Sequence, residues 1–291
     1  MNIFLTGYSG KIGSKISNSL QSSNHKLFKI NLREDPSNFS QRELDGKTCF
    51  IHMASLNKRL YKKDISTELN LMKDAISICS QNKIKNFLFL STYKVYKTNH
   101  QSKEIENDLN ISTNDSYAKA KIMCERLLIE SANNFDSIII LRMPPVLMSS
   151  KHSNLGYIFK VCDLIPILPF FRLGNENKRS FLSINNIVSF INYVLQKELS
   201  GNFILNFADS FPISTNELIR QYLKKYHPNK KTFYFPNAFE QLLLKLPFLS
   251  KILDKLYGSK NLDTSILKNT FPDFTIQDTS SSILKYGIIS E

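Results

Sequence analysis

Two runs of the sequence are apolar at almost every position, and they limit the fold more than any other feature. "NFLFLST" (86–92) and "SIIILR" (137–142) offer no polar face to solvent, so each is expected to be a strand buried on both sides. Shorter apolar runs at 2–6, 26–30 and 49–55 alternate with segments of helical spacing. This alternation is typical of a parallel sheet between two helical layers. The sequence therefore predicts a doubly wound, Rossmann-type α/β domain.

A change of pattern after Arg142 predicts a second, smaller unit. Prolines interrupt the apolar stretch that follows, at 144, 145, 166 and 169. Ser214 is the expected N-cap of a helix over 214–226. We therefore expect a dinucleotide-binding domain at 1–143 plus about 178–206, and a smaller, mostly helical substrate lobe at 144–177 and 207–291.

The bulk properties predict a cytoplasmic globular protein. No window reaches 18 consecutive apolar residues, and the first residues do not form a signal peptide. The four cysteines, at 49, 79, 124 and 162, lack the spacing of metal ligands. We expect them to be buried small hydrophobes, with no metal site.

The net charge of +13 is concentrated in the C-terminal third. Residues 220–260 carry nine Lys or Arg against Glu240 and Asp254. A basic patch fits nucleic acid, an anionic membrane surface or a phosphorylated small molecule, and it also fits a plain solvated face. No nucleic-acid motif is present, so no nucleic-acid partner is expected. The segment 239–257, "FEQLLLKLPFLSKILDKLY", could contact a membrane, although packing against the sheet is favoured.

A glycine-rich turn lies between the first strand and the first helix. "TGYSGKIG" places Gly7, Gly10 and Gly13 at three-residue spacing. Glycines permit a tight turn and a close approach of backbone to a pyrophosphate, which the free N–H groups of a helix start attract. The sequence therefore predicts dinucleotide binding by this turn, including Ser9, Lys11 and Ile12.

The GxxGxxG spacing resembles that of the extended short-chain dehydrogenase/reductases, the NAD-dependent epimerase/dehydratase family. "FIHMAS", "ELNLMKDAISICSQNKIKNFLFLSTYKVY", "YAKAKIMCE", "SFLSINNI" and "GNFILNFAD" are similar to later motifs of that family in the same order. The resemblance covers nearly the whole chain. It implies that further residues line the cofactor: Met53, Ala54, Ser55, Asn70, Ser91, Pro144 and Val146.

The family's YxxxK pair has four candidates here: Tyr93/Lys97, Tyr117/Lys121, Tyr193/Lys197 and Tyr226/Lys230. Only Tyr117 lies on a predicted helix between the "LST" strand end and the next buried strand. One helical turn places Tyr117 and Lys121 on the same face. Lys119, between them, is expected to face solvent.

The resemblance implies that Tyr117 exchanges a proton while hydride moves between the cofactor and a sugar carbon. A free tyrosine is too weak an acid for efficient proton exchange at neutral pH, and a lysine charge nearby favours the phenolate. Lys121 would also hold the nicotinamide ribose. Thr92 would hydrogen-bond the reacting oxygen, with Ser91 as support.

The end of the second strand bears on the choice of cofactor. NAD-selective members have an acidic residue there, whereas this chain has Asn31 and then Arg33. An arginine can pair with the 2′-phosphate of NADP, although Glu34 or Asp35 could bind a ribose instead. NADPH/NADP is therefore favoured, and NAD stays open.

The middle of the chain resembles enzymes that reduce the C4 keto group of UDP-linked 2-acetamido-4-keto-6-deoxy sugars, as in UDP-N-acetylquinovosamine formation. Carried over, Arg179 would contact the diphosphate, Asn154 would lie near the nucleotide or sugar, and Thr92 and Tyr93 would contact the substrate. Leu147 and Met148 replace the family's usual Tyr-Gly.

Three functions stay open from the sequence. The first is NAD(P)H-dependent reduction of a UDP-linked 4-keto sugar for surface polysaccharides. The second is a 4-epimerase with tightly bound NAD, and the third is a non-catalytic nucleotide-binding scaffold. The family resemblance also implies a homodimer formed through the helices at 67–82 and around Tyr117.

Overall fold

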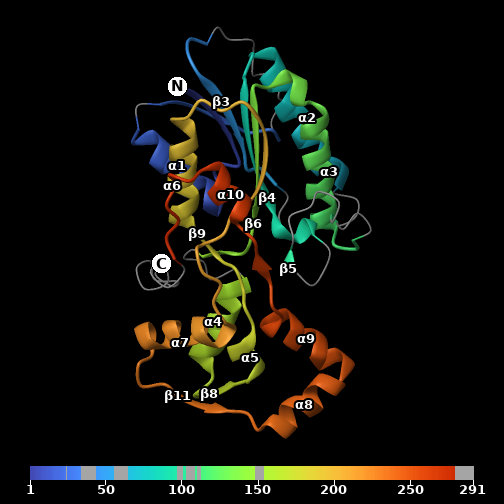
Figure 1. Cartoon of the computed structure of the whole chain (residues 1–291), viewed down its shortest axis with the longest axis vertical. Coiled ribbons are helices and arrows are strands. Elements are labelled where there is room, and N and C mark those ends of the chain that lie inside the picture. Colours follow the sequence, from blue (N-terminus) through green and yellow to red (C-terminus); the bar gives the residue numbers. More distant parts are fainter. Residues whose placement is uncertain are drawn as a thin grey trace.

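A six-stranded sheet forms the centre of the molecule (Figure 1). The computed structural model describes residues 1–23, 25–33, 44–55, 65–96, 101–102, 109, 113–147 and 154–278. Every pairing in the sheet is parallel, in the order β10-β6-β4-β3-β1-β2. Its strands are β1 (Asn2–Thr6), β2 (Lys26–Ile30), β3 (Thr48–His52), β4 (Asn86–Thr92), β6 (Ser137–Met143) and β10 (Gly201–Asn206). The predicted Rossmann-type fold is confirmed.

The direction of winding reverses at β1. The chain passes from β1 to β2 on one side and then returns to β3 on the other, so β1 lies between them. Parallel sheets bind ligands in the crevice outside the carboxyl ends of the strands at such a reversal. The residues that follow β1 and β3 are therefore placed at the expected cofactor position.

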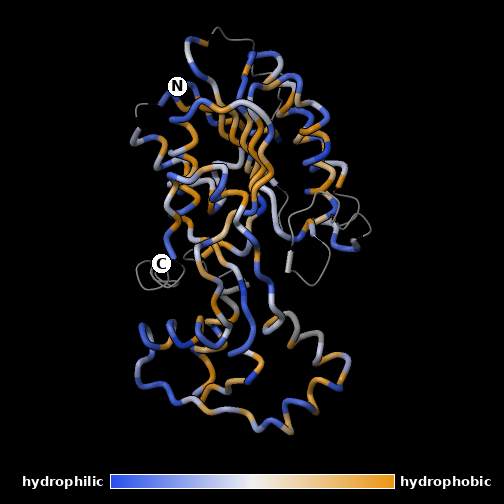
Figure 2. The backbone as a smooth tube through the Cα atoms, in the orientation of Figure 1, coloured by the Kyte–Doolittle hydropathy of each residue, from blue (hydrophilic) through white to orange (hydrophobic). Residues whose placement is uncertain are grey.

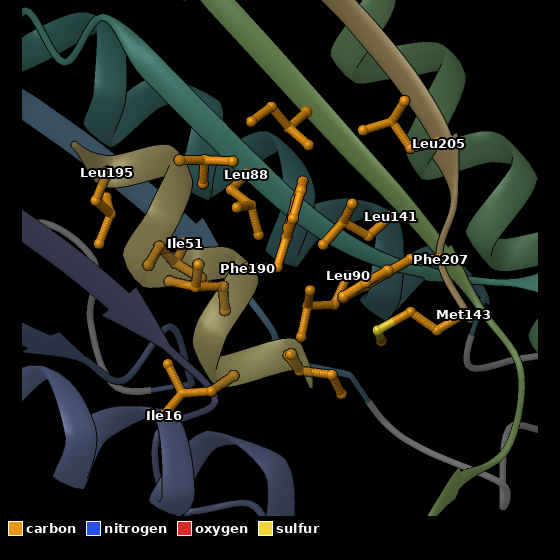
Figure 3. Close-up of a cluster of buried hydrophobic side chains, with 14 of the residues drawn as sticks. Ile16, Ile51, Leu88, Leu90, Leu141, Met143, Phe190, Leu195, Leu205 and Phe207 are labelled. Atoms are coloured by element: carbon orange, nitrogen blue, oxygen red, sulfur yellow. The ribbon is translucent and has the colours of Figure 1, made fainter. Parts of the chain in front are cut away.

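Helices cover both faces of the sheet (Figure 1). One face carries α1 (Lys11–Gln21) and α6 (Ile184–Leu195), and the other carries α2 (Ile65–Gln81) and α3 (Ser116–Glu130). Figure 3 shows the first of these cores, where Phe190 of α6 lies among strand residues such as Leu141 and Leu205. Figure 2 shows that the sheet is the most hydrophobic part of the chain.

The C-terminal part of the described chain returns to this domain. Helix α10 (Ser265–Thr270) buries Leu267 in the core beside α6, and Phe271 packs edge-on against Phe190 with their centroids 5.4 Å apart. The amide of Asn186 donates to the carbonyl of Gln277 at 3.0 Å. We had expected all of 207–291 in the smaller lobe. Residues 265–277 instead pack on the sheet, because their aromatic side chains fill the α6 face.

The smaller lobe is mostly helical. It contains α4 (Asn154–Leu164), α5 (Leu173–Glu176), α7 (Thr215–Tyr226), α8 (Asn237–Lys245), α9 (Pro247–Tyr257) and a two-stranded sheet of β8 (Ile167–Phe170) and β11 (Lys231–Tyr234). Its core stacks Phe159 of α4 on Tyr222 of α7, with ring centroids 4.2 Å apart. The Ser214 hydroxyl accepts from the Glu217 N–H at 3.1 Å, as expected of an N-cap.

Helix α8 lies at the end of the lobe farthest from the six-stranded sheet, and α9 runs from there back toward the junction of the two parts (Figure 1). The expectation that segment 239–257 packs against that sheet is therefore wrong. The one buried residue of α8 is Glu240, whose carboxylate accepts from the backbone N–H groups of Arg172 and Leu173 in the smaller lobe. Within the described ranges, every helix is too short or too polar to cross a membrane.

The 3-10 helix η6 (Ala132–Asn134) connects α3 with β6. The other short elements are the 3-10 helix η4 (Tyr93–Val95) and the strands β5 (Gln101–Ser102), β7 (Val146–Leu147), β9 (Leu182–Ser183) and β12 (Asn261–Leu262). The pairing of β7 with β9 brings the chain back from the lobe beside its exit from β6. All four cysteines are free and buried, as expected of small hydrophobes.

Candidate active site

The glycine turn after β1 is shaped for a close ligand. Gly7 has φ +70°, and a Cβ there would lie 2.6 Å from the backbone N of Ala54. A Cβ on Gly13 would lie 2.0 Å from the carbonyl oxygen of Gly7. Gly10 is the N-cap of α1 and supplies no side-chain cap, so the first N–H groups of the helix point at the crevice. The turn therefore has the geometry of a pyrophosphate site.

A threonine joins the ends of β1 and β3. The Thr6 hydroxyl accepts from the N–H groups of Met53 at 3.2 Å and Ala54 at 3.4 Å. The same oxygen lies 2.9 Å from Nδ1 of His52, to which it can donate its proton. Burial, and then the charge of Lys121, lower the pKa of His52 to about 3. A neutral His52 thus fixes the backbone of Met53 and Ala54 against the glycine turn.

Helix α3 brings Tyr117 to the carboxyl end of β4. The helix begins after Asp115, whose carboxylate accepts from the N–H groups of Tyr117 at 3.0 Å and Ala118 at 3.2 Å. Lys94 of η4 pairs with the same carboxylate at 2.7 Å, and its Nζ lies 5.7 Å from the centre of the Tyr117 ring. Burial alone would raise the pKa of Asp115, but Lys94 and the backbone donors lower it on balance. The half-buried Tyr117 is thereby held at a fixed helix start.

Lys121 is buried behind that tyrosine. Its Nζ lies 5.9 Å from the centre of the Tyr117 ring, 3.4 Å from the carbonyl oxygen of Leu90 and 4.6 Å from the centre of the Phe89 ring. It also forms an ion pair with Glu68 of α2 at 3.4 Å. Burial opposes the charge of Lys121, but the neighbouring Tyr117 and Glu68 outweigh it and raise the pKa of Lys121. The lysine therefore stays charged next to the tyrosine, while Lys119 is exposed.

Glu68, which the sequence analysis did not single out, is the residue of α2 that pairs with Lys121. Asn70, the predicted cofactor residue of this helix, lies on its exposed side. Two residues correspond to about 200° around a helix, so Glu68 and Asn70 point in nearly opposite directions. Glu68 lies on the same buried side of α2 as Leu71, Met72 and Ala75. This helical periodicity is the sequence signal that could have identified Glu68 as a buried residue.

The two hydroxyls at the end of β4 have different partners. The Thr92 hydroxyl caps η4 by accepting from the Lys94 N–H at 3.4 Å. The buried Ser91 hydroxyl instead donates to Glu125 of α3, next to the ion pair that Glu125 forms with Arg142 at 2.7 Å. Ser91 thus joins β4 to α3 beneath the site, and Thr92 lies nearer its surface.

The Glu125–Arg142 pair belongs to a larger buried network. Arg142 donates to the Tyr96 hydroxyl at 3.1 Å, and that hydroxyl donates to Asn206 at 2.6 Å. The amide of Asn206 donates to the carbonyl of Asp263 at 3.0 Å. The network connects α3 with β6, β10 and the segment that precedes α10.

The predicted substrate residues are only partly described. Burial raises the pKa of Tyr93, while the charges of Arg179 and Lys94 oppose that shift, so Arg179 lies within electrostatic reach of the site. The Arg179 guanidinium also donates to the carbonyl of Leu256 at 2.7 Å. Helix α4 begins at Asn154. The side chain of Asn154 and the whole of Met148 lie outside the part of the chain that the structure describes.

The predicted cofactor residues follow the strand ends. Asn31 and Arg33 are exposed just after β2, and the Arg33 N–H donates to the Asn31 side chain at 3.3 Å. Glu34 and Asp35 lie outside the described residues. Pro144 is buried, and Val146 is half-buried at the start of β7. Asn31 and Arg33 thus follow β2, the strand next to β1, whereas Pro144 and Val146 follow β6, which β4 and β3 separate from β1.

Comparison with known proteins agrees with this geometry. Residues 3–206 match the model of the family described as the NAD dependent epimerase/dehydratase family. The chain belongs to this family. The matched residues include the glycine turn, the residues at the ends of β3 and β4, and the helix that carries Tyr117.

Three relatives span almost the whole chain. A UDP-glucose 4-epimerase of Vibrio cholerae is 25% identical over 95% of this chain and 92% of its own length. The UDP-N-acetylglucosamine 4-epimerase from Methanobrevibacter ruminantium M1, solved with UDP-N-acetylmuramic acid, has a TM-score of 0.70 at 17% identity and covers 98% and 96% of the two chains. The RMD protein of Pseudomonas aeruginosa, solved with NADPH, has a TM-score of 0.67 at 14% identity and covers 98% of each chain. The two structures show the shared fold.

Proposed function

We propose that this epimerase/dehydratase chain is a UDP-sugar 4-epimerase that retains its NAD. The observation that carries the proposal is the position of Tyr117, with the buried charge of Lys121 behind it, at the same carboxyl edge of the sheet as the glycine turn. The similarity to a UDP-glucose 4-epimerase supports epimerisation over the reduction that the sequence favoured. The intact tyrosine and lysine argue against a non-catalytic scaffold.

The residues around the crevice fit a nicotinamide dinucleotide. Gly7 and Gly13 leave no room for a Cβ, and the start of α1 offers backbone N–H groups to a pyrophosphate. Ser9, Gly10, Lys11 and Ile12 would complete that contact, with Met53, Ala54 and Ser55 beside it. When bound, the cofactor supplies a reversible hydride acceptor.

The side chains at the strand ends would manage the proton. In the proposed reaction, Tyr117 removes the proton from the sugar C4 hydroxyl and later returns it to the C4 oxygen. Lys121 keeps its positive charge behind the Tyr117 ring and would hold the nicotinamide ribose. Thr92 would hydrogen-bond the reacting oxygen. Tyr93, Asn154 and Arg179 would bind the UDP-sugar, with Arg179 on the diphosphate.

Reduction of a UDP-linked 4-keto sugar is the second candidate. Arg33 favours it, because this exposed guanidinium follows β2, where it could bind the 2′-phosphate of NADPH. The same Tyr117 would then donate a proton to the C4 oxygen as hydride arrives. A role in surface polysaccharide synthesis would accompany this activity.

One experiment separates the two activities. Purified protein is incubated with UDP-glucose or UDP-N-acetylglucosamine without added reductant, and the products are analysed by NMR. Formation of the C4 epimer supports epimerisation. In a parallel incubation, UDP-4-keto sugars and deuterated NADPH are analysed by mass spectrometry. Stoichiometric NADPH consumption with deuterium at C4, and no epimer in the first incubation, would instead establish reduction.

A further inference from the structure

An exposed apolar surface lies at the far end of the smaller lobe. Helix α8 and the first turn of α9 present four large apolar side chains to solvent, which we name the α8–α9 apolar face: Phe239 (56% exposed), Leu242 (55%), Leu246 (47%) and Phe248 (75%). The first three recur at helical spacing along one side of α8. Clusters of this kind on soluble proteins mark interaction sites.

Aromatic rings extend this face onto β11. The ring centroids of Phe239 and Phe235 are 6.1 Å apart, and those of Phe235 and Phe233 are 5.6 Å apart. Phe235 also stacks on Phe171 at 5.1 Å, which joins the series to the lobe. Phe233 is itself exposed. The apolar face is therefore a continuous part of a packed surface.

A buried carboxylate fixes the orientation of α8. Glu240 accepts from the backbone N–H groups of Arg172 and Leu173, each at 2.9 Å, and its side chain is buried. Because Glu240 points into the lobe, the opposite side of α8 points away from it. Figure 1 places this helix at the end of the molecule opposite the six-stranded sheet. The outward side carries the apolar face.

The exposed charged side chains of β11 and α8 are lysines. Lys231 of β11 and Lys245 of α8 are both exposed. Between residues 221 and 250 the only acidic residue of the sequence is Glu240, which is turned inward. Figure 2 shows hydrophobic and hydrophilic stretches alternating along this part of the chain. Exposed apolar side chains bordered by lysines are typical of helices that lie in the interface of an anionic membrane.

We propose that the α8–α9 apolar face docks on an anionic lipid surface. Phe239, Leu242, Leu246 and Phe248 enter the headgroup and acyl boundary, and the surrounding lysines contact the lipid phosphates. A second copy of this chain fits the face poorly, because a twofold contact here would bring lysines of one sign together. The inference is independent of the reaction at Tyr117, since lipid binding requires neither cofactor nor sugar.

Vesicle sedimentation tests the proposal with the full chain. We expect it to sediment with phosphatidylglycerol/phosphatidylcholine vesicles at about 10 mM salt and to remain in solution at about 1 M, where charges are screened beyond about 3 Å. Each lysine near the surface contributes about a fivefold change in partitioning. Lys231→Glu with Lys245→Glu should therefore weaken binding by at least about 25-fold. Phe239→Ser with Phe248→Ser should also weaken it.

Matched controls separate this face from general stickiness. Phe211→Ser removes another exposed phenylalanine outside the face, and Lys83→Glu with Lys85→Glu makes the same charge change at the end of α2. Neither should alter sedimentation by more than about twofold. No binding at low salt, equal binding to pure phosphatidylcholine, or an equal loss in the controls would overturn the proposal. The proposal would also be overturned if sedimentation velocity showed a dimer of the parent chain and no dimer of the double variant Phe239→Ser with Phe248→Ser.

Discussion

The Nζ of Lys121 lies 3.4 Å from a carboxylate oxygen of Glu68, and both side chains are only 2% exposed. Removal of one partner from a buried pair leaves an uncompensated charge, which typically costs about 3–5 kcal/mol. We therefore expect Glu68→Ala to lower the free energy of unfolding by that amount in urea titrations. Burial lowers the pKa of Lys121, but the neighbouring Tyr117 and Glu68 outweigh burial and raise the pKa on balance. The stabilisation by this pair should therefore be complete below pH 10.5 and should be lost as the pH rises above that value.

Two further variants separate charge from packing at this pair. Glu68→Ala with Lys121→Met removes both charges and should recover most of the lost stability. Lys73→Met, on the exposed side of α2, should change the unfolding free energy by less than about 0.5 kcal/mol. Equal stability of Glu68→Ala and the parent chain would show that the ion pair does not form.

Gly13→Ala should damage the cofactor turn. Its Cβ would lie 2.0 Å from the carbonyl oxygen of Gly7, so the turn would have to open. Overpacking of this kind costs about 1–3 kcal/mol, and the same loss in binding free energy corresponds to about a fivefold to 150-fold loss of NADH affinity in a fluorescence titration. Gly46→Ala is the control, since Gly46 has φ +79° but nothing within 4 Å. It should cost about 1 kcal/mol of stability and leave NADH affinity unchanged. Unaltered NADH binding by Gly13→Ala would contradict the assignment of this turn.

The strands and the helix that carries Tyr117 are predictable because their signals are local. Runs such as 86–92 and 137–142 are buried on both faces, and no other arrangement hides them as well as a parallel sheet between helices. The context of Tyr117, on a helix between two such strands, separated it from the other YxxxK pairs. The structure brings Tyr117, Lys121 and Thr92 together at the end of β4.

The residues that sequence reasoning missed depend on long-range contacts. A glutamate on a helix usually faces solvent, and only the partner Lys121 makes a buried Glu68 acceptable. Ser91 is directed to Glu125, which the strand pattern alone does not reveal. Likewise, the amphipathic pattern of 239–257 shows that one side is apolar, but it does not specify whether a sheet covers that side.

His52 should make folding sensitive to mild acid. Burial, and then the charge of Lys121, lower the pKa of His52 to about 3 in the folded state. As the pH falls below 6.5, the imidazole of the unfolded chain is protonated while that of the folded chain stays neutral. Its contribution is fully present above pH 6.5 and is lost at about 1.4 kcal/mol per pH unit as the pH falls toward 3. Urea unfolding at a series of pH values should show this slope, and His52→Gln should lack it. Parallel curves for the two proteins would refute a neutral, buried His52.

The network beneath the site should respond like a buried ion pair. Arg142→Met leaves Glu125 without its partner and should cost about 3–5 kcal/mol in urea unfolding. Tyr96→Phe removes the hydrogen bonds of that hydroxyl to Arg142 and Asn206 and should cost about 1–3 kcal/mol. Arg126→Met, at an exposed position on the same helix, should stay within about 0.5 kcal/mol of the parent. Similar losses for Arg126→Met and Arg142→Met would be inconsistent with the network.

The most direct test of the central claim is the rate of C4 chemistry in Tyr117→Phe, measured by NMR of the UDP-sugar products under saturating cofactor. Loss of a positioned proton donor and acceptor should lower kcat by about 10²–10⁴-fold. Tyr193→Phe, from a half-buried tyrosine of another YxxxK pair on α6, is the matched control and should retain the parent rate. A loss confined to Tyr117→Phe is the predicted result. Full activity in that variant would contradict the assignment of Tyr117 as the catalytic acid and base.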